Sequence, residues 1–212
     1  MKIGILALQG DFIEHTYIIE KLGARLIPVR KAEQLEGLDG LIIPGGESTT
    51  ILNLMHSYNM FQPIKELAHS SLPVMGTCAG MVLLAKRVFN PDMSTLALMD
   101  IEVRRNAFGR QVDSFETEVS LPLLGDKPFP AVFIRAPLIE NTGPDVDIIG
   151  RLPDNKIVAA RQGNILAFSF HPELSNDTRI HRYFLEIVAG FKSGDRKEAI
   201  INRLHQPIYN QP

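Results

Sequence analysis

The segment Val74-Met75-Gly76-Thr77-Cys78-Ala79-Gly80 (VMGTCAG) contains the pattern that decides the fold. Val74 and Met75 are typical of a short buried strand, and the apolar run over residues 81–88 predicts a helix soon after it. The glycines on both sides of Cys78 let the backbone turn sharply between the two elements. The segment therefore predicts a strand, a tight turn that presents Cys78, and a helix.

The residues before this segment repeat the alternation of strand and helix. Asp11, with Glu14 three residues later, is an N-cap pattern that opens a helix, and Gly23 closes it. Three buried strands and two further helices are predicted: strands at Lys2–Leu8, Ala24–Val29 and Gly40–Ile43, helices at Ser48–Tyr58 and Phe61–Ala68. This order indicates a parallel sheet with helices on both faces.

After Asn90 the pattern changes to short β-type runs separated by Gly, Pro, Asn and Asp, which is typical of antiparallel strands. These runs are Leu98–Arg104, Phe115–Ser120, Ala131–Ile134, Asp147–Leu152, Lys156–Gln162 and Ile165–Phe170. Apolar residues from Ile180 to Phe191 then recur at helical spacing. We expect an α/β fold with three layers: a mostly parallel central sheet, helices on both faces and added antiparallel strands. One domain should cover residues 1–192, and the polar residues 193–212 should form a peripheral tail.

Composition narrows the functional classes. The 212 residues carry a net charge of −2, which provides no electrostatic footprint for nucleic acid or an anionic membrane. No apolar run approaches the roughly 20 residues that span a bilayer. A cytoplasmic protein is expected, and its single cysteine cannot form an internal disulfide.

Cys78 is either a small buried side chain or a reactive thiol. Residue type alone favours burial. Its position between a strand and a helix favours reactivity, because a glycine-flanked turn of this kind is a nucleophile elbow and the positive end of the helix favours the thiolate.

His171-Pro172-Glu173 can supply the base and its orienting carboxylate. His171 follows a strand-like run, which would place it at the edge of the sheet beside Cys78. The other histidines lie in helical or terminal segments and are expected to be surface or packing residues: His15, His56, His69, His181 and His205. The triplet is a weak signal alone, but with the cysteine elbow it predicts a Cys-His-Glu triad.

Pro44-Gly45-Gly46-Glu47-Ser48 follows the third predicted strand and opens a helix. Its backbone N–H groups can point into the crevice at the strand ends. The N–H groups of Gly46 and Ala79 are therefore candidates for an oxyanion hole. The alternative is a phosphate-binding loop, but the Gly-Lys-Ser/Thr of that motif is absent.

These motifs resemble the class I, or triad, glutamine amidotransferases, and within them the glutaminase subunits of pyridoxal 5'-phosphate synthases. The resemblance covers most of the chain, from Lys2 to about Phe191. It rests on the segments 8–10, 14–15, 44–50, 76–80, 105–115, 133–137 and 169–173. The elbow and the His-Pro-Glu triplet are shared by the wider class, whereas the segments 105–115 and 134–137 are specific to these subunits.

The resemblance implies that Cys78 is the nucleophile, His171 the general base and acid, and Glu173 its orienting residue. It implies glutamine binding by Gly46, Glu47, Ser48, Arg105, Ile134 and Arg135, and contact with a partner through Gln9 and Gly10. No metal or organic cofactor is implied. The implied partner is a (β/α)8 synthase subunit that receives ammonia, within a large hetero-oligomer.

Other functions stay open at this point. The chain could serve another class I amidotransferase, or be a non-catalytic regulatory subunit on the same fold. A small cysteine hydrolase of the intracellular protease type is a further alternative. The segments specific to the pyridoxal phosphate subunits and the complete triad disfavour all three.

Overall fold

The computed structural model describes residues 1–108 and 114–192, and a ten-stranded sheet forms the centre of this part. Five neighbouring strands of the sheet are parallel. In spatial order they are β2 (Arg25–Val29), β1 (Lys2–Leu6), β3 (Gly40–Ile43), β4 (Val74–Thr77) and β12 (Ile165–Phe168). The predicted tail at 193–212 lies outside the described residues, so the domain boundary at 192 stays a prediction.

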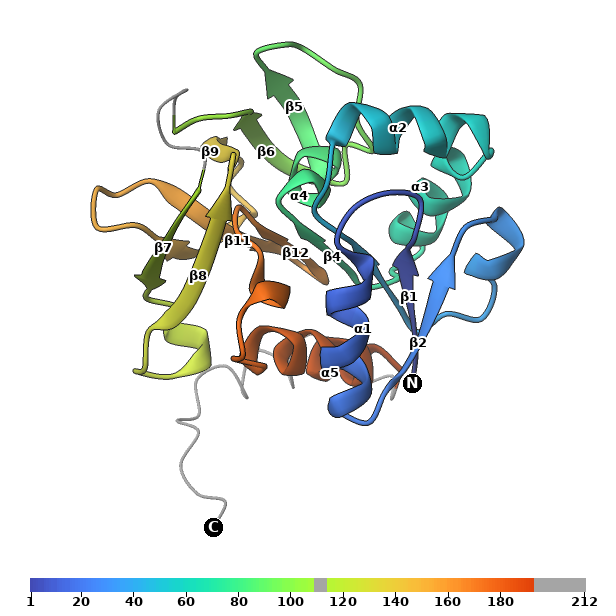
Figure 1. The fold of residues 1–212 in the computed structure, drawn as a ribbon. Helices are drawn as coiled ribbons and strands as arrows, with labels where there is room; N and C mark the ends of the chain where they lie inside the picture. Colours follow the sequence, from blue (N-terminus) through green and yellow to red (C-terminus); the bar gives the residue numbers. More distant parts are fainter. Residues whose placement is uncertain (109–113, 193–212) are drawn as a thin grey trace.

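The remaining strands extend the sheet beyond β12, mostly in antiparallel pairs (Figure 1). These are β11 (Ile157–Gln162), β9 (Leu138–Thr142), β6 (Met99–Arg104) and β5 (Ala85–Phe89), with β10 (Asp147–Arg151) paired to β11. A separate hairpin-like pair is formed by β7 (Ser114–Val119) and β8 (Phe129–Ile134). The predicted antiparallel additions are therefore present.

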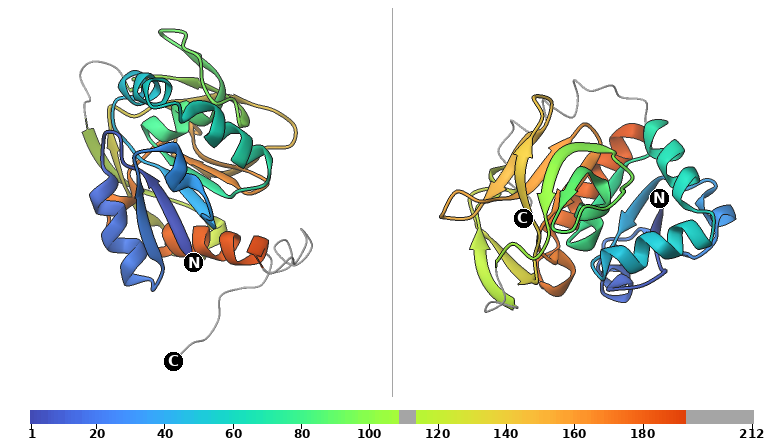
Figure 2. Two further views of the ribbon diagram at one scale, coloured as in Figure 1. Left: turned by 90° about the vertical axis from the view of Figure 1, so that its right-hand side faces the viewer. Right: turned by 90° about the horizontal axis from the view of Figure 1, so that it is seen from above.

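Helices cover both faces of the sheet (Figure 1, Figure 2). One core packs against α2 (Ser48–Ser57), α3 (Phe61–His69) and α4 (Ala79–Leu84), and the other against α1 (Phe12–Lys21), α5 (Arg179–Lys192) and the β7–β8 pair. Three 3-10 turns complete the described elements: η1 (Ala32–Leu35), η2 (Pro122–Leu124) and η3 (Pro172–Leu174).

The inner strands of the parallel half, β1, β3, β4 and β12, are buried on both faces over nearly their whole length. In β3, Leu41 and Ile43 point into one core and Ile42 into the other, because successive side chains of a strand alternate between faces. Continuous apolar runs of this kind require cover on both sides of a sheet. The predicted three-layer α/β architecture is confirmed.

Three element predictions were wrong in detail. The apolar run 81–88 is not one helix, because α4 ends at Leu84 and residues 85–89 form β5, which pairs with β6. β9 was not predicted at all. β12 was placed among the antiparallel runs, but it ends at Phe168 and pairs in parallel with β4. Pairing with distant strands decided each of these, and a local pattern does not contain that information.

The neighbouring strands β4 and β12 bring two distant parts of the chain together. Thr77 is in register with Phe168, so the residues that follow both strands emerge at the same edge of the sheet. The loops after β1 and β3 leave at this edge as well, because all four strands are parallel. Functional side chains in α/β sheets commonly gather at this edge.

The close approach of α4 to β3 depends on the missing side chain of Gly80. A Cβ atom at Gly80 would lie 2.0 Å from the carbonyl oxygen of Ile43, which is backbone and cannot move aside. We expect Gly80→Ala to lower the free energy of unfolding by about 3 kcal/mol, measured by urea denaturation. Gly23→Ala is the matched control, because its Cβ would meet no atom and only its left-handed backbone (φ 79°) costs about 1 kcal/mol. Equal losses in the two variants would contradict the close approach.

Candidate active site

Cys78 occupies a strained turn between β4 and α4. Its φ of 46° and ψ of −103° lie outside the regions that side-chain-bearing residues normally adopt. Its N–H donates to the carbonyl of Phe168 at 2.8 Å, which ties the turn to β12. The thiol is 8% exposed, and its Sγ lies 3.8 Å from the carbonyl oxygen of Ile134. Such strain concentrates at functional sites, at a cost of about 1–3 kcal/mol.

His171 and Glu173 form a buried pair next to this turn. Nδ1 of His171 lies 2.7 Å from Oε1 of Glu173, and both residues are at most 5% exposed. The backbone N–H of His171 donates to the carbonyl of Val132, and Glu173 lies in the single turn η3. Pro172 therefore allows the carboxylate to turn back to the ring, as the sequence predicted.

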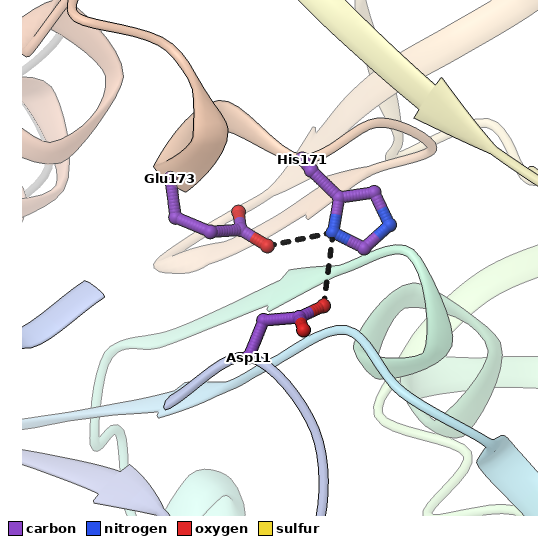
Figure 3. A group of neighbouring side chains, drawn as sticks. All are labelled: Asp11, His171 and Glu173. Carbon is purple, nitrogen blue, oxygen red and sulfur yellow. Dashed lines mark hydrogen bonds and ion pairs between the residues drawn. The ribbon is translucent and has the colours of Figure 1, made fainter. Parts of the chain in front are cut away.

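Asp11 is a second carboxylate at the same ring nitrogen. Its Oδ2 lies 3.3 Å from Nδ1 of His171, and Figure 3 shows Asp11 and Glu173 approaching that nitrogen from different segments. The local sequence pattern predicts that Asp11 caps the N-terminus of α1. The prediction is wrong for the side chain, because the Asp11 carboxylate makes no capping hydrogen bond and faces His171 instead.

The acidic neighbours determine the charge of His171. Burial disfavours the imidazolium, but interactions with Asp11, Cys78 and Glu173 outweigh burial and raise the pKa of His171 to about 12. The hydrogen bond from His171 in turn lowers the pKa of Asp11. Burial raises the pKa of Glu173, although His171 acts in the opposite direction. Nε2 of His171 has no hydrogen-bond partner in the described residues.

Asp11, His171 and Glu173 are also the one group in the described residues that could hold a metal ion, since one ligand atom from each lies within 4.8 Å of the others. A metal ion between them would have to replace the proton that joins Nδ1 of His171 to the two carboxylates. The donor set therefore suits proton transfer better than metal binding.

The loop after β3 lies against the ring of His171. A Cβ atom at Gly45 would be 2.3 Å from Cε1 of His171, so only glycine fits this position. Gly46 has a φ of 149°, and a Cβ atom there would be 2.6 Å from Oε1 of Gln9. Gly45 thus lies against the ring of His171, and Gly46, which is predicted to line an oxyanion hole, lies against the loop after β1.

Gln9 and Gly10 hold this loop from the other side. Oε1 of Gln9 accepts a hydrogen bond from the N–H of Glu47 at 2.8 Å. A Cβ atom at Gly10 would be 1.8 Å from the carbonyl oxygen of Gly45, and the N–H of Asp11 donates to the same oxygen. The segment 9–11 therefore contacts both the predicted oxyanion loop and the base.

Glu47 and Arg105, both predicted to bind substrate, are paired with each other. Nη2 of Arg105 lies 2.9 Å from Oε1 of Glu47. Glu47 also accepts hydrogen bonds from the N–H groups of Thr49 and Thr50 at the start of α2. Burial opposes the charge, but hydrogen bonds from Thr50 and Thr49 lower the pKa of Glu47 to about 2. An ionised Glu47 thus orients the guanidinium of Arg105 at the rim of the site.

The other predicted substrate residues take different positions. The carbonyl of Ile134 contacts the thiol of Cys78, as described above. Arg135 is exposed and has a left-handed backbone (φ 42°), and Ser48 is 4% exposed at the start of α2. The structure therefore connects Ile134 directly to the thiol of Cys78, whereas no hydrogen bond or ion pair within the described residues joins Arg135 to it.

His15 is the residue of the site that the sequence analysis missed. It was expected to be a surface or packing residue, yet it is fully buried and its Nε2 lies 3.3 Å from Oε2 of Glu173. His15 and Glu173 are 158 residues apart in sequence, so no local spacing pattern could predict their contact. In the sequence, His15 carries only the family resemblance of the segment 14–15.

Asp11 should control the proton on His171. Asp11→Asn removes one carboxylate, so the pKa of His171 should fall, and its ring signals in NMR should titrate at a lower pH than in the wild type. Because the pKa of His171 is raised above its ordinary 6.5, the stability gained from this contact is complete below pH 6.5 and is lost as the pH rises toward 12. Asp154→Asn, which removes an exposed carboxylate beside Lys156, should leave the titration unchanged. An unaltered His171 titration in Asp11→Asn would refute the contact.

Comparisons with known proteins agree with this geometry. Residues 5–190 match the model of the SNO glutamine amidotransferase family. A curated relative from Dehalococcoides mccartyi, "Pyridoxal 5'-phosphate synthase subunit PdxT", is 56% identical over 91% of this chain and 100% of its own length. A protein of the same name from Moorella thermoacetica is 55% identical over 89% of this chain and 100% of its own.

Solved structures agree with the fold described above. One described as a glutamine amidotransferase is 46% identical, with a TM-score of 0.82 over 88% of this chain and 98% of that chain. A putative GMP synthase subunit from Thermoplasma acidophilum, at 18% identity and a TM-score of 0.68, shares the fold. The matched family model spans nearly all of the described residues, including the strained cysteine turn and the His-Pro-Glu triplet. The chain belongs to the SNO glutamine amidotransferase family.

Proposed function

We propose that this chain is the glutaminase subunit of a pyridoxal 5'-phosphate synthase, which hydrolyses L-glutamine to L-glutamate and ammonia. The observation that carries the proposal is the meeting of a strained Cys78 with the buried pair of His171 and Glu173 at one edge of the sheet. The names of the relatives from Dehalococcoides mccartyi and Moorella thermoacetica support the assignment to this synthase.

The first half of the reaction transfers the glutamyl group to the enzyme. The thiolate of Cys78 attacks the side-chain amide carbon of glutamine and forms a C–S bond. The imidazolium of His171 then donates its proton to the amide nitrogen, the C–N bond breaks, and ammonia leaves behind a glutamyl thioester. The carboxylates at Nδ1 of His171 hold the ring in the orientation that this proton transfer requires.

The second half releases glutamate. Neutral His171 accepts a proton from a water molecule, whose oxygen attacks the thioester carbon. The C–S bond breaks, the thiolate of Cys78 is restored, and the acid that forms ionises to glutamate. His171 is again an imidazolium, so the site returns to its starting charge. Both halves pass through a tetrahedral oxyanion, for which the N–H groups of Gly46 and Ala79 are the proposed donors.

Arg105 and Arg135 are the proposed partners of the substrate carboxylate, because guanidinium groups bind carboxylates through charge-assisted hydrogen bonds. Arg105 is pre-oriented by Glu47. Gly46, Glu47, Ser48 and Ile134 complete the proposed glutamine site. The alternative is a glutaminase serving another class I amidotransferase, and the same triad chemistry would apply.

The proposed partner is a (β/α)8 synthase subunit that receives the ammonia within a large hetero-oligomer. Gln9 and Gly10 are the proposed sensors of that partner, since the segment 9–11 contacts Gly45, Glu47 and His171. Docking against this segment could therefore reorient the oxyanion loop, whose two glycines change conformation at little steric cost.

Among the helices of residues 1–108 and 114–192, none has the length and apolar character of a membrane span. A cytoplasmic location is our expectation.

Cys78 should be the site of covalent attack. Treatment with a glutamine-derived diazo-ketone should add one label, which peptide mass spectrometry should locate on Cys78. Cys78→Ala should lose glutaminase activity by a factor of about 10⁴ or more, because the nucleophile acts as a unit with its base. Labelling elsewhere, or full activity in Cys78→Ala, would overturn the assignment.

The isolated chain should be a poor glutaminase. Adding saturating synthase subunit should raise turnover by about a hundredfold to a thousandfold, the range for restoring one oxyanion-hole donor, with a smaller change in KM. Steady-state glutamine hydrolysis at equal chain concentration measures this, with an unrelated protein in place of the synthase as the control. Equal turnover in both mixtures would show that the site needs no partner.

A further inference from the structure

Two histidines outside the proposed triad are buried beside it and have no part in the mechanism above. His15 in α1 and His181 in α5 are both 0% exposed. Nδ1 of His15 lies 2.9 Å from Nε2 of His181, and Nε2 of His15 lies 3.3 Å from both Oε2 of Glu173 and Oγ1 of Thr77. Fully buried polar side chains are costly unless each has a hydrogen-bond partner.

We infer that His15 is a positioning residue for the glutaminase reaction: its Nε2–H attracts Oε2 of Glu173, which lies 3.3 Å away and has no hydrogen bond of good geometry in the described residues, and His181 sets the His15 tautomer that places a proton on Nε2. The inference rests on the proposed function and extends the Cys78-His171-Glu173 unit by two residues. Glu173 would then be fixed through both of its oxygens, Oε1 by His171 and Oε2 by His15.

The direction of the hydrogen bonds follows from what each atom can do. An ionised carboxylate oxygen only accepts, so the proton between His15 and Glu173 must be on Nε2 of His15. A neutral imidazole carries one proton, so Nδ1 of His15 is then an acceptor. His181 must therefore donate from its own Nε2, which leaves its Nδ1 as a bare lone pair.

The reverse arrangement is less favourable. If His15 carried its proton on Nδ1, its Nε2 lone pair could accept from the hydroxyl of Thr77 but would face the carboxylate oxygen of Glu173 without a proton between them. His181 would then accept at Nε2 and carry its proton on Nδ1, which has no hydrogen-bond partner in the described residues. An orphaned buried N–H group is rarer in proteins than an under-used acceptor.

Both histidines are suited to stay neutral. Burial lowers the pKa of His15 well below its ordinary value, and the charges of His181 and His171 act in the same direction. Burial also lowers the pKa of His181, to about 3. A neutral His15 has one N–H for Glu173 and adds no positive charge that would compete with His171 for the carboxylate.

The tautomers can be observed in the wild-type chain. In ¹⁵N NMR of histidine-labelled protein at neutral pH, His15 and His181 should each show a protonated Nε2 and an unprotonated Nδ1. His15→Gln and His181→Gln variants identify the signals by their loss. A His15 ring protonated on Nδ1, or an imidazolium, would overturn the inference.

Two substitutions of His15 test the effect on catalysis. In His15→Gln the amide nitrogen can occupy the position of Nε2 and still donate to Glu173, whereas His15→Leu keeps the bulk and removes the donor. We expect His15→Leu to lower kcat by about tenfold to a hundredfold with little change in KM, as for the loss of an orienting partner of a catalytic group. His15→Gln should retain kcat within a few-fold of the wild type.

His69→Leu is the matched control, since His69 is an exposed helical histidine whose ring nitrogen Nδ1 bonds to the carbonyl of Lys65 on its own helix. It should leave kcat unchanged. Equal kcat losses in His15→Gln and His15→Leu would reduce His15 to a packing residue and refute the inference. The NMR measurement needs no turnover, so a chain that fails to hydrolyse glutamine even with saturating synthase subunit would refute the proposed function without deciding the tautomers of His15.

Discussion

The parallel pairing of β4 with β12 is the constraint on which the site depends. The register of Thr77 with Phe168, continued by the hydrogen bond from Cys78 to Phe168, fixes where the nucleophile stands relative to the residues after β12. His171 follows only three residues later. A shift of this register by one residue would turn the side chains to the opposite faces of the sheet and separate thiol from base.

Steric limits around the glycines keep the loops of this edge in close contact. Gly10 meets the carbonyl of Gly45, Gly45 meets the ring of His171, and Gly80 meets the carbonyl of Ile43, each at distances that leave no room for a Cβ atom. The loops after β1 and β3 therefore converge on one imidazole, through Asp11 and Gly45. The same packing puts the segment before α1 in direct contact with His171, which is the physical ground on which we propose control by a docking partner.

At the centre of the site, the imidazolium of His171 contacts two carboxylates that differ in their exposure to solvent. Glu173 is buried and held by His171 and His15, whereas the side chain of Asp11 is 39% exposed and lies at the end of a loop. A buried ion pair contributes little net stability, because desolvation offsets most of its attraction. The ion pair instead serves to orient the ring of His171. The buried carboxylate of Glu173 keeps this ring in place, whereas the exposed carboxylate of Asp11 is accessible to a partner that binds at the surface.

The sequence by itself determined the three-layer α/β fold, the strand-turn-helix around Cys78 and the His-Pro-Glu triplet, because each depends on residue types within a short segment. Only the tertiary structure decided the roles of Asp11 and His15. Their local patterns predict a helix cap and a packing residue, but contacts with His171 and Glu173, about 160 residues away in sequence, redirect both side chains. Local patterns report backbone geometry and burial, whereas the partner of a buried polar group is chosen by whichever distant segment the fold brings beside it.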